Sequence, residues 1–251
     1  TIIDDFRSSD IKAGGQGAPL APLFHSFLFG DEEEIRCVLN IGGIGNVSIF
    51  KGGEVIAGYD TGPGNVLMDS WSMHNGIGPY DRNGDWARSG KLNDPLQMSL
   101  LEQDNFIEKS HPKSTGTDYY NIDFIIRAIK ECGQDIKPED VQRTLLEFTA
   151  GSFAFIGEDN INMPIEERSS WIAISGGGSK NKFLVERIED LFYLMPGELK
   201  TTEAWGVDSE WVEALGFAYL AFLRMNEISV DLSKVTGSRS QILLGNIQTP
   251  N

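Results

Sequence analysis

The sequence predicts an α/β fold with a mixed sheet, in which an antiparallel three-stranded meander is flanked by helices. Three short β-rich runs, RCVLNI, NVSIF and EVIAGY, follow one another from Arg36 and are separated only by GGIG and KGG. Because glycine permits the positive φ angles that tight turns require, these separators indicate hairpins. Apolar positions then recur at helical spacing over residues 121–132 and 137–156, which predicts two helices.

The elements before and directly after the meander are shorter. Residues 1–18 predict the end of a strand and a polar, Gly-rich loop, and Pro19 opens a helical pattern that runs to about Phe29. Residues 66–78 have helical spacing, and residues 79–120 form a polar insertion with short helical pieces. Insertions of this kind often carry specificity.

The second half of the chain begins with WIAIS, a short buried strand at residues 171–175. GGGSKN and an amphipathic helix over residues 182–192 follow this strand without a gap. We expect a short strand at residues 198–201, an apolar helix at residues 209–224 and a terminal tail.

Composition excludes several classes of protein. The formal charge of -16 and pI near 4.5 argue against binding of nucleic acid or anionic lipid, because clustered Lys and Arg hold phosphate groups. The longest apolar stretch, Trp211–Leu223, is shorter than the roughly 20 residues that cross a bilayer. Cys37 and Cys132 lack metal spacing, as do the three histidines, so we predict reduced thiols, a cytoplasmic protein and no metal ligands among these residues.

The first candidate for chemistry is LNIGGIGNVS, where a strand turns through Gly42, Gly43 and Gly45 into the next strand. Without Cβ atoms the backbone can approach a ligand closely, and successive N–H groups can converge on phosphate oxygens. The alternative is an ordinary hairpin turn, because such turns are also rich in glycine.

The second candidate is ISGGGSKN, where Gly176, Gly177 and Gly178 lie between a buried strand and a predicted helix N-terminus. First-turn amides and the helix dipole favour an anion or a nucleotide at such a place. Close packing of strand on helix is the alternative. A dinucleotide fingerprint is less suitable, because the last glycine of G-x-G-x-x-G is absent.

The third candidate is GYDTGPGN, which places Asp60 at a strand end beside a glycine loop. A rigidly held carboxylate next to open space suits a general base. The alternative is that Asp60 caps the turn through backbone amides.

Two further sites have equally open interpretations. Glu213 is the only charged residue in Trp211–Leu223, so it would either hydrogen-bond a substrate or lie on the exposed stripe of its helix. Lys113, Ser114 and Thr115 could meet a ligand, although a turn with a solvated lysine is the more frequent meaning of such a sequence.

Taken together and in this order, the motifs resemble the anhydro-N-acetylmuramic acid kinases, members of the actin-like sugar kinase superfamily. The resemblance runs from about residue 3 to the C-terminus and also includes DFR, DIKAGGQGAPL, PKSTG and the helix EALGFAYLA. It implies an actin-like, RNase H-like kinase fold. Residues 1–35 would be the remnant of an N-terminal domain with the substrate loop, and residues 36–251 a C-terminal nucleotide-binding domain with its insertion near 79–120.

The resemblance also implies a reaction. ATP would phosphorylate O6 of 1,6-anhydro-N-acetylmuramic acid while water, activated by Asp60, opens the anhydro ring during peptidoglycan recycling. The implied contacts fall into three groups: Gly42, Gly43, Gly45 and Asn46 at the phosphates; Gly176, Gly177 and Gly178 at the adenosine; and Arg7, Gly15, Gln16, Gly17, Gly62, Asn65 and Glu213 at the sugar.

Family members begin with a first strand and a G-x-M-S-G-T-S-x-D-G-x-D loop, which is not present in these residues. That loop binds phosphate and supplies the acid near Mg²⁺, so the start at Thr1 indicates a cut and we expect poor phosphoryl transfer from these residues alone. Expected partners are ATP and the sugar, with a homodimer as a further possibility. The alternatives are a non-catalytic nucleotide-binding or interaction domain of the same fold, and a dehydrogenase.

Overall fold

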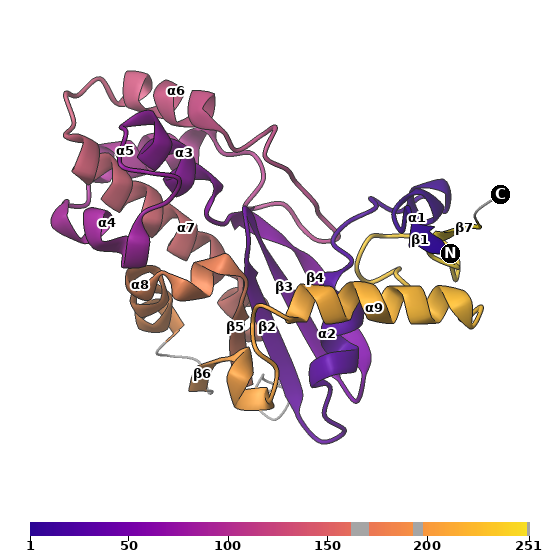
Figure 1. Ribbon diagram of the computed structural model, residues 1–251. Helices are drawn as coiled ribbons and strands as arrows, with labels where there is room; N and C mark the ends of the chain where they lie inside the picture. Colours follow the sequence, from indigo (N-terminus) through magenta and orange to yellow (C-terminus); the bar gives the residue numbers. More distant parts are fainter. Residues whose placement is uncertain (162–170, 193–197, 250–251) are drawn as a thin grey trace.

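The computed structural model describes residues 1–161, 171–192 and 198–249, which fold around a five-stranded mixed sheet (Figure 1). Its strands lie in the order β4-β3-β2-β5-β6. They are β2 (Ile35–Ile41), β3 (Ile44–Lys51), β4 (Glu54–Pro63), β5 (Trp171–Ser175) and β6 (Glu198–Thr201). β2, β3 and β4 pair antiparallel, whereas β5 is parallel to β2 and to β6. This arrangement confirms the predicted α/β class and the antiparallel meander within a mixed sheet.

The central strand β2 contributes to two cores, because successive side chains of a strand point to opposite faces. Cys37, Leu39 and Ile41 belong to the large core on one face. Val38 belongs to a smaller core on the other face, together with Phe29 of α2 (Ala21–Phe29). A strand buried on both faces reads as a continuous apolar run, which is why VLNI was recognisable as a strand.

Helices of the middle of the chain cover the first face, as the left half of Figure 1 shows. They are α3 (Val66–His74), α4 (Asp85–Ser89), α5 (Asp94–Gln103), α6 (Ile122–Cys132), α7 (Pro138–Ile161) and α8 (Lys182–Phe192). Local signals fix their ends: the Asn121 side chain accepts a hydrogen bond from Phe124 N at the start of α6, and Gly133 (φ 65°) ends that helix.

Helix α9 (Val212–Met225) lies beside α2 on the second face (Figure 1). Its buried positions are Val212, Gly216, Leu220 and Leu223, and Gly216 allows close contact, since a Cβ there would lie 2.6 Å from Phe24. The part of the chain that the structure describes has no helix that is both long and apolar enough to cross a membrane.

The two ends of the chain meet in a small unit that the sequence did not reveal. β1 (Ile2–Asp4) pairs antiparallel with β7 (Asn246–Gln248), and α1 (Ser8–Lys12) follows β1. The strand end expected within residues 1–18 is present as β1, whereas α1 and the strand in the terminal tail were not predicted. A strand of three residues such as β7 is recognisable only from its partner, and here the partner lies more than 240 residues away.

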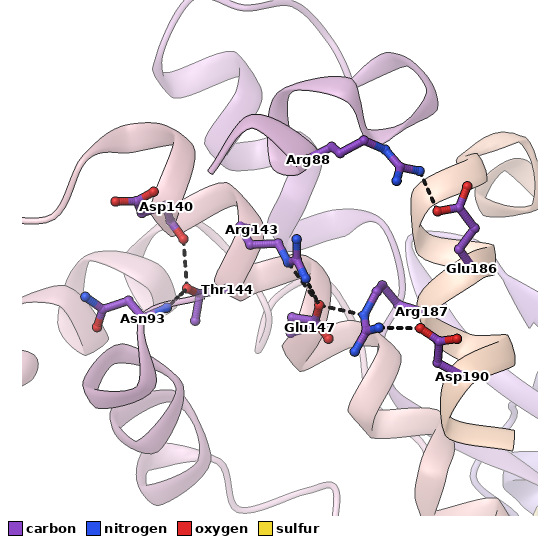
Figure 2. A network of polar contacts seen from close by, with 9 residues as sticks. All are labelled: Arg88, Asn93, Asp140, Arg143, Thr144, Glu147, Glu186, Arg187 and Asp190. Carbon is purple, nitrogen blue, oxygen red and sulfur yellow. Dashed lines mark hydrogen bonds and ion pairs between the residues drawn. The ribbon is translucent and has the colours of Figure 1, made fainter. Parts of the chain in front are cut away.

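A polar network joins the helical layer (Figure 2). Glu147 of α7 is largely buried and accepts hydrogen bonds from Arg143 and from Arg187 of α8, both at its Oε1. The guanidinium groups of Arg88 and Arg143 lie over the ring of Phe183 at 4.1 and 4.5 Å. The network holds α7 and α8 together.

Candidate active site

One cleft of about 860 Å³ brings together residues from distant parts of the chain. Gly43 at the β2–β3 turn, Gly177 after β5 and Asp60 of β4 all line it. Arg7 and Glu213 line it as well. The volume suits a ligand of nucleotide or sugar size, since small-molecule pockets measure about 300–1,000 Å³.

The turn after β2 is pinned to the start of α3. The carbonyl oxygen of Gly42 accepts from Asn65 N at 2.8 Å, and that of Gly43 accepts from Gly64 N at 2.9 Å. Gly42 and Gly43 line the cleft, and a Cβ on Gly43 would meet no atom nearer than 3.9 Å. Gly45 has a different surrounding, because its Cβ would lie 2.6 Å from Phe153 in the core. Gly43 thus faces open space, an added Cβ on Gly42 would lie 3.4 Å from the carbonyl oxygen of Ile44, and Gly45 permits packing.

The glycines after β5 divide in the same way. Gly176 adopts φ +80°, and its Cβ would lie 2.7 Å from Asn40 Oδ1, so both conformation and space require glycine. Gly178 packs on Ile41, whose Cγ2 would be 2.2 Å from an added Cβ. Gly177 lines the cleft, and within the described part of the chain an added Cβ would meet only Asn65 Nδ2 within 4 Å, at 3.9 Å.

The predicted helix over residues 182–192 is confirmed, but the turn that precedes it was not predicted. A 3₁₀ helix, η3 (Gly177–Lys180), lies between β5 and α8, so the glycines do not open the α-helix directly. α8 begins at Lys182 behind Asn181, whose Oδ1 accepts from Leu184 N at 3.1 Å. A ligand at Gly177 would therefore meet the turn, not the α8 terminus.

Asp60 is 5% exposed, and a bulge in β4 orients it. The register shift between Gly45 and Asn46 places Asn46 opposite Asp60 across the two strands. Asp60 Oδ2 accepts from Ser114 Oγ at 2.8 Å and from Thr115 N at 2.9 Å. These bonds come from the insertion and not from the turn that follows Asp60.

The electrostatic surroundings of Asp60 act in opposite directions. Burial raises the pKa of its carboxyl group, and the bonds from Thr115 and Ser114, with the charge of Arg7, lower it. Beside it, Asn46 lines the cleft, and Asn46 Oδ1 is buried without a hydrogen-bond partner in the part of the chain that the structure describes. An unsatisfied buried oxygen at a cleft wall is costly unless a ligand or water satisfies it.

Residues of the predicted sugar loop lie mostly beside the cleft instead of in its wall. Gly17 N donates to Asp10 Oδ2 at 2.7 Å, and a Cβ on Gly15 would lie 2.3 Å from the same oxygen. Gln16 Nε2 donates to the carbonyl of Pro112 at 2.9 Å. The loop is thus wound around the buried Asp10, and of its predicted contacts Arg7 reaches the cleft.

Three other predicted sugar contacts have distinct surroundings. Gly62 packs on Ser152, 2.9 Å from an added Cβ, and Asn65 Nδ2 donates to Ile41 O at 3.3 Å, so neither is a cleft-wall residue. Glu213 lines the cleft and is exposed, which agrees with the predicted alternative of a position on the exposed stripe of its helix. It lies on α9 next to buried Val212, at the cleft rim where water reaches it.

Several cleft residues escaped the sequence analysis. Asn40, near the end of β2, lines the cleft, and its Oδ1 accepts a hydrogen bond from Ser175 Oγ at 3.1 Å. His25 lies 2.8 Å from Ser48 Oγ through Nδ1, and burial lowers its pKa to about 3, so it is neutral. Lys180 and Glu210 form an ion pair at the cleft. GGGSK could have pointed to Lys180, whereas His25 carries no sequence signal.

Among the described residues there is no group of three or more His, Cys, Asp or Glu side chains that could hold a metal ion. Mg²⁺ in nucleotide sites is commonly held by one or two protein oxygens plus the phosphates. A metal ion at this cleft would therefore be held chiefly through the phosphates of a bound nucleotide.

Solved structures with a partial likeness include the activator of the 2-hydroxyisocaproyl-CoA dehydratase from Clostridium difficile, with a TM-score of 0.44 and 15% identity. That match covers 82% of this chain and 66% of the other. The ethanolamine utilization protein EutJ from Carboxydothermus hydrogenoformans has a TM-score of 0.39 and 14% identity, over 79% and 52% of the two chains. Because these TM-scores are low, the description of the fold rests on the strand order and not on these similarities.

Sequence relatives match far more closely. Anhydro-N-acetylmuramic acid kinases from Sulfurovum sp. (strain NBC37-1) and Pasteurella multocida (strain Pm70) are 41% and 40% identical over 98% of this chain. The chain spans 64% and 63% of the length of these two relatives. The sequence model of the family described as Anhydro-N-acetylmuramic acid kinase matches residues 1–250. The chain therefore belongs to the anhydro-N-acetylmuramic acid kinase family.

Proposed function

We propose that this chain carries the nucleotide and sugar sites of an ATP-dependent kinase that acts on 1,6-anhydro-N-acetylmuramic acid. The observation that supports this most is the convergence of Gly43, Gly177 and Asp60 on one cleft. Two cleft-facing glycine turns can hold a nucleotide, and a buried carboxylate beside them can act on an acceptor.

In this proposal, the phosphates lie at Gly42 and Gly43, where the backbone leaves room for close approach. Asn46 lies next to them, with an amide oxygen that lacks a protein partner in the described region. The adenosine lies against Gly176 and Gly177. Mg²⁺ would accompany the phosphates and supply charge stabilisation of the transferring group when bound.

Asp60 would be the general base. Water attacks C1 of the sugar and gives its proton to the Asp60 carboxylate, while the C1–O6 bond breaks and its electron pair stays on O6. O6 forms the bond to the γ-phosphorus, and the bond between that phosphorus and ADP breaks. The product would be N-acetylmuramic acid 6-phosphate. A carboxylate of this kind must lie within hydrogen-bond reach of the water, and Asp60 lines the cleft.

Arg7 and Glu213 line the cleft and are the sugar contacts that we retain. The positive charge of Arg7 is close enough to Asp60 to lower the pKa of its carboxyl group, so Arg7 and the proposed base lie in the same part of the cleft. Its charge suits the carboxylate of the lactyl ether, to which arginine can bind in bidentate fashion. Exposed Glu213 can accept hydrogen bonds from sugar hydroxyls.

In this proposal, full activity requires a protein of the length of these relatives, because the chain spans less than two thirds of their length. Phosphoryl transfer depends on positioning and charge stabilisation from several clamps, so we expect slow turnover from these 251 residues alone. Turnover at the rates of complete family members would contradict this expectation.

Product mass tests the reaction directly. The chain is incubated with ATP, Mg²⁺ and the anhydro sugar, and the sugar product is analysed by mass spectrometry. We expect the sugar to gain one phosphoryl group (HPO₃) and one water molecule. Addition of phosphate alone would refute the ring opening, and absence of nucleotide binding by calorimetry would refute the assignment of the cleft.

A further inference from the structure

The Asp60 carboxylate is held from one side by a segment that begins more than 50 residues later in the sequence. Ser114 Oγ and Thr115 N both donate to Asp60 Oδ2, at 2.8 and 2.9 Å, and neither bond engages Oδ1. Asp60 N in turn donates to the carbonyl of Lys113 at 3.2 Å. The strand end and the segment 113–115 are therefore joined through both backbone and side chain.

The segment 113–115 is itself anchored in the protein. The Lys113 side chain is buried, and its Nζ donates to the carbonyl of Ile107 at 2.5 Å. The same ammonium group lies 5.0 Å from the ring centre of Phe106 and 5.6 Å from that of Tyr59. Because these contacts come from the protein, the segment is held before any ligand binds.

Two hydrogen bonds to one oxygen fix the rotation of a carboxylate. The bonds to Asp60 are charge-assisted, and such bonds are roughly twice as strong as neutral ones. They direct lone pairs of Oδ2 away from a substrate and leave Oδ1 as the oxygen with freedom to accept a proton. Thr115 also lines the cleft, so the held oxygen and the substrate space adjoin.

We propose that Ser114, together with the Thr115 amide, is a positioning residue that orients Asp60 so that Oδ1 receives the proton of the attacking water. This inference rests on the proposed function and deepens it. Ser114 touches neither the sugar nor the nucleotide in this account and acts only through Asp60. The serine of the motif PKSTG therefore has a role in orienting Asp60, which the interpretation as a simple turn did not give it.

Loss of the Ser114 hydroxyl has a defined effect on the titration of Asp60. Its hydrogen bond lowers the pKa of the carboxyl group, against the upward effect of burial. Ser114→Ala should therefore raise that pKa, so ionisation of the base is completed only at higher pH. The acid limb of the rate against pH should move in the same direction.

The experiment compares Ser114→Ala with Ser114→Thr, which keeps a hydroxyl, and with Ser110→Ala at an exposed position. Carbon NMR of the Asp60 carboxyl group follows its titration in the ligand-free chain, and urea unfolding confirms that each variant folds. Turnover is measured as a ratio to wild type, for which slow turnover suffices. We expect about tenfold slower turnover for Ser114→Ala, an unchanged KM for the sugar, and recovery in Ser114→Thr.

Two results would overturn the inference. One is an unchanged Asp60 titration in Ser114→Ala while ligands still bind, and the other is an equal effect of Ser110→Ala. Failure of the proposed function would look different, because wild type would then bind neither an ATP analogue nor the anhydro sugar in calorimetry. In that case a shifted Asp60 titration in Ser114→Ala would still show that Ser114 contacts Asp60, but the contact would have no role in catalysis.

Discussion

Replacement of the adjacent glycines Gly177 and Gly178 by alanine should have opposite effects. At Gly178 the new methyl group would lie 2.2 Å from Cγ2 of Ile41, a fully buried residue at the end of β2, and 3.0 Å from Asn65 Oδ1. Overpacking of this kind costs about 1–3 kcal/mol. At Gly177 the nearest atom would be 3.9 Å away, so alanine fits and should stabilise the fold by about 0.4–1 kcal/mol through the unfolded chain.

Binding should separate the two variants in the other direction. The methyl group of Gly177→Ala would project toward the cleft, so we expect at least about tenfold weaker binding of an ATP analogue, equivalent to about 1.4 kcal/mol. Urea unfolding measures the stability and calorimetry the affinity. Equal loss of stability in both variants, or unweakened binding in Gly177→Ala, would refute the division of these glycines into ligand-facing and packing positions.

Two further predictions concern the helical layer. Glu147→Gln should lower the free energy of unfolding by about 2 kcal/mol, because it leaves two partly buried arginines without their carboxylate. The matched control Glu186→Gln breaks a half-exposed ion pair and should lower it by less than about 1 kcal/mol. Urea unfolding measures both values, and equal losses would contradict the prediction. Burial and the negative charge of Asp81 raise the pKa of Asp69 to about 6 from 3.8, so its ionisation opposes folding as pH rises through that window. Asp69→Asn should therefore be more stable than wild type at pH 7 and equal to it below about pH 4, and a difference independent of pH would refute the argument.

The meander and the long helices could be predicted because their signals are local. VLNI reads as a doubly buried strand, and GGIG marks its hairpin. The pairing of β1 with β7 could not be predicted, since each strand has three residues and the signal lies in their contact. The start of α8 at Lys182 was predicted, whereas the 3₁₀ turn at Gly177–Lys180 was missed because glycines permit many backbone conformations.

The site shows the same division. Asp60 and the two glycine turns were identifiable from strand ends and glycines, and they lie around one cleft. The role of Gly45 and Gly178 was not identifiable, because only the fold reveals Phe153 and Ile41 as their neighbours. The sequence left open whether Glu213 is exposed. The exposed part of α9 also carries many apolar side chains, so the neighbours of Glu213 in the sequence did not report its burial.

Titration calorimetry with wild type and Asp60→Asn tests the central claim most directly, with an ATP analogue added first and the anhydro sugar second. If Asp60 is the base of a cleft that holds both ligands, the variant should bind each of them within a few-fold of wild type, and the residual turnover of the chain should fall at least about 10²-fold. Turnover that persists in Asp60→Asn while both ligands bind would contradict the account, and would leave Asp60 with a purely structural role at the end of β4.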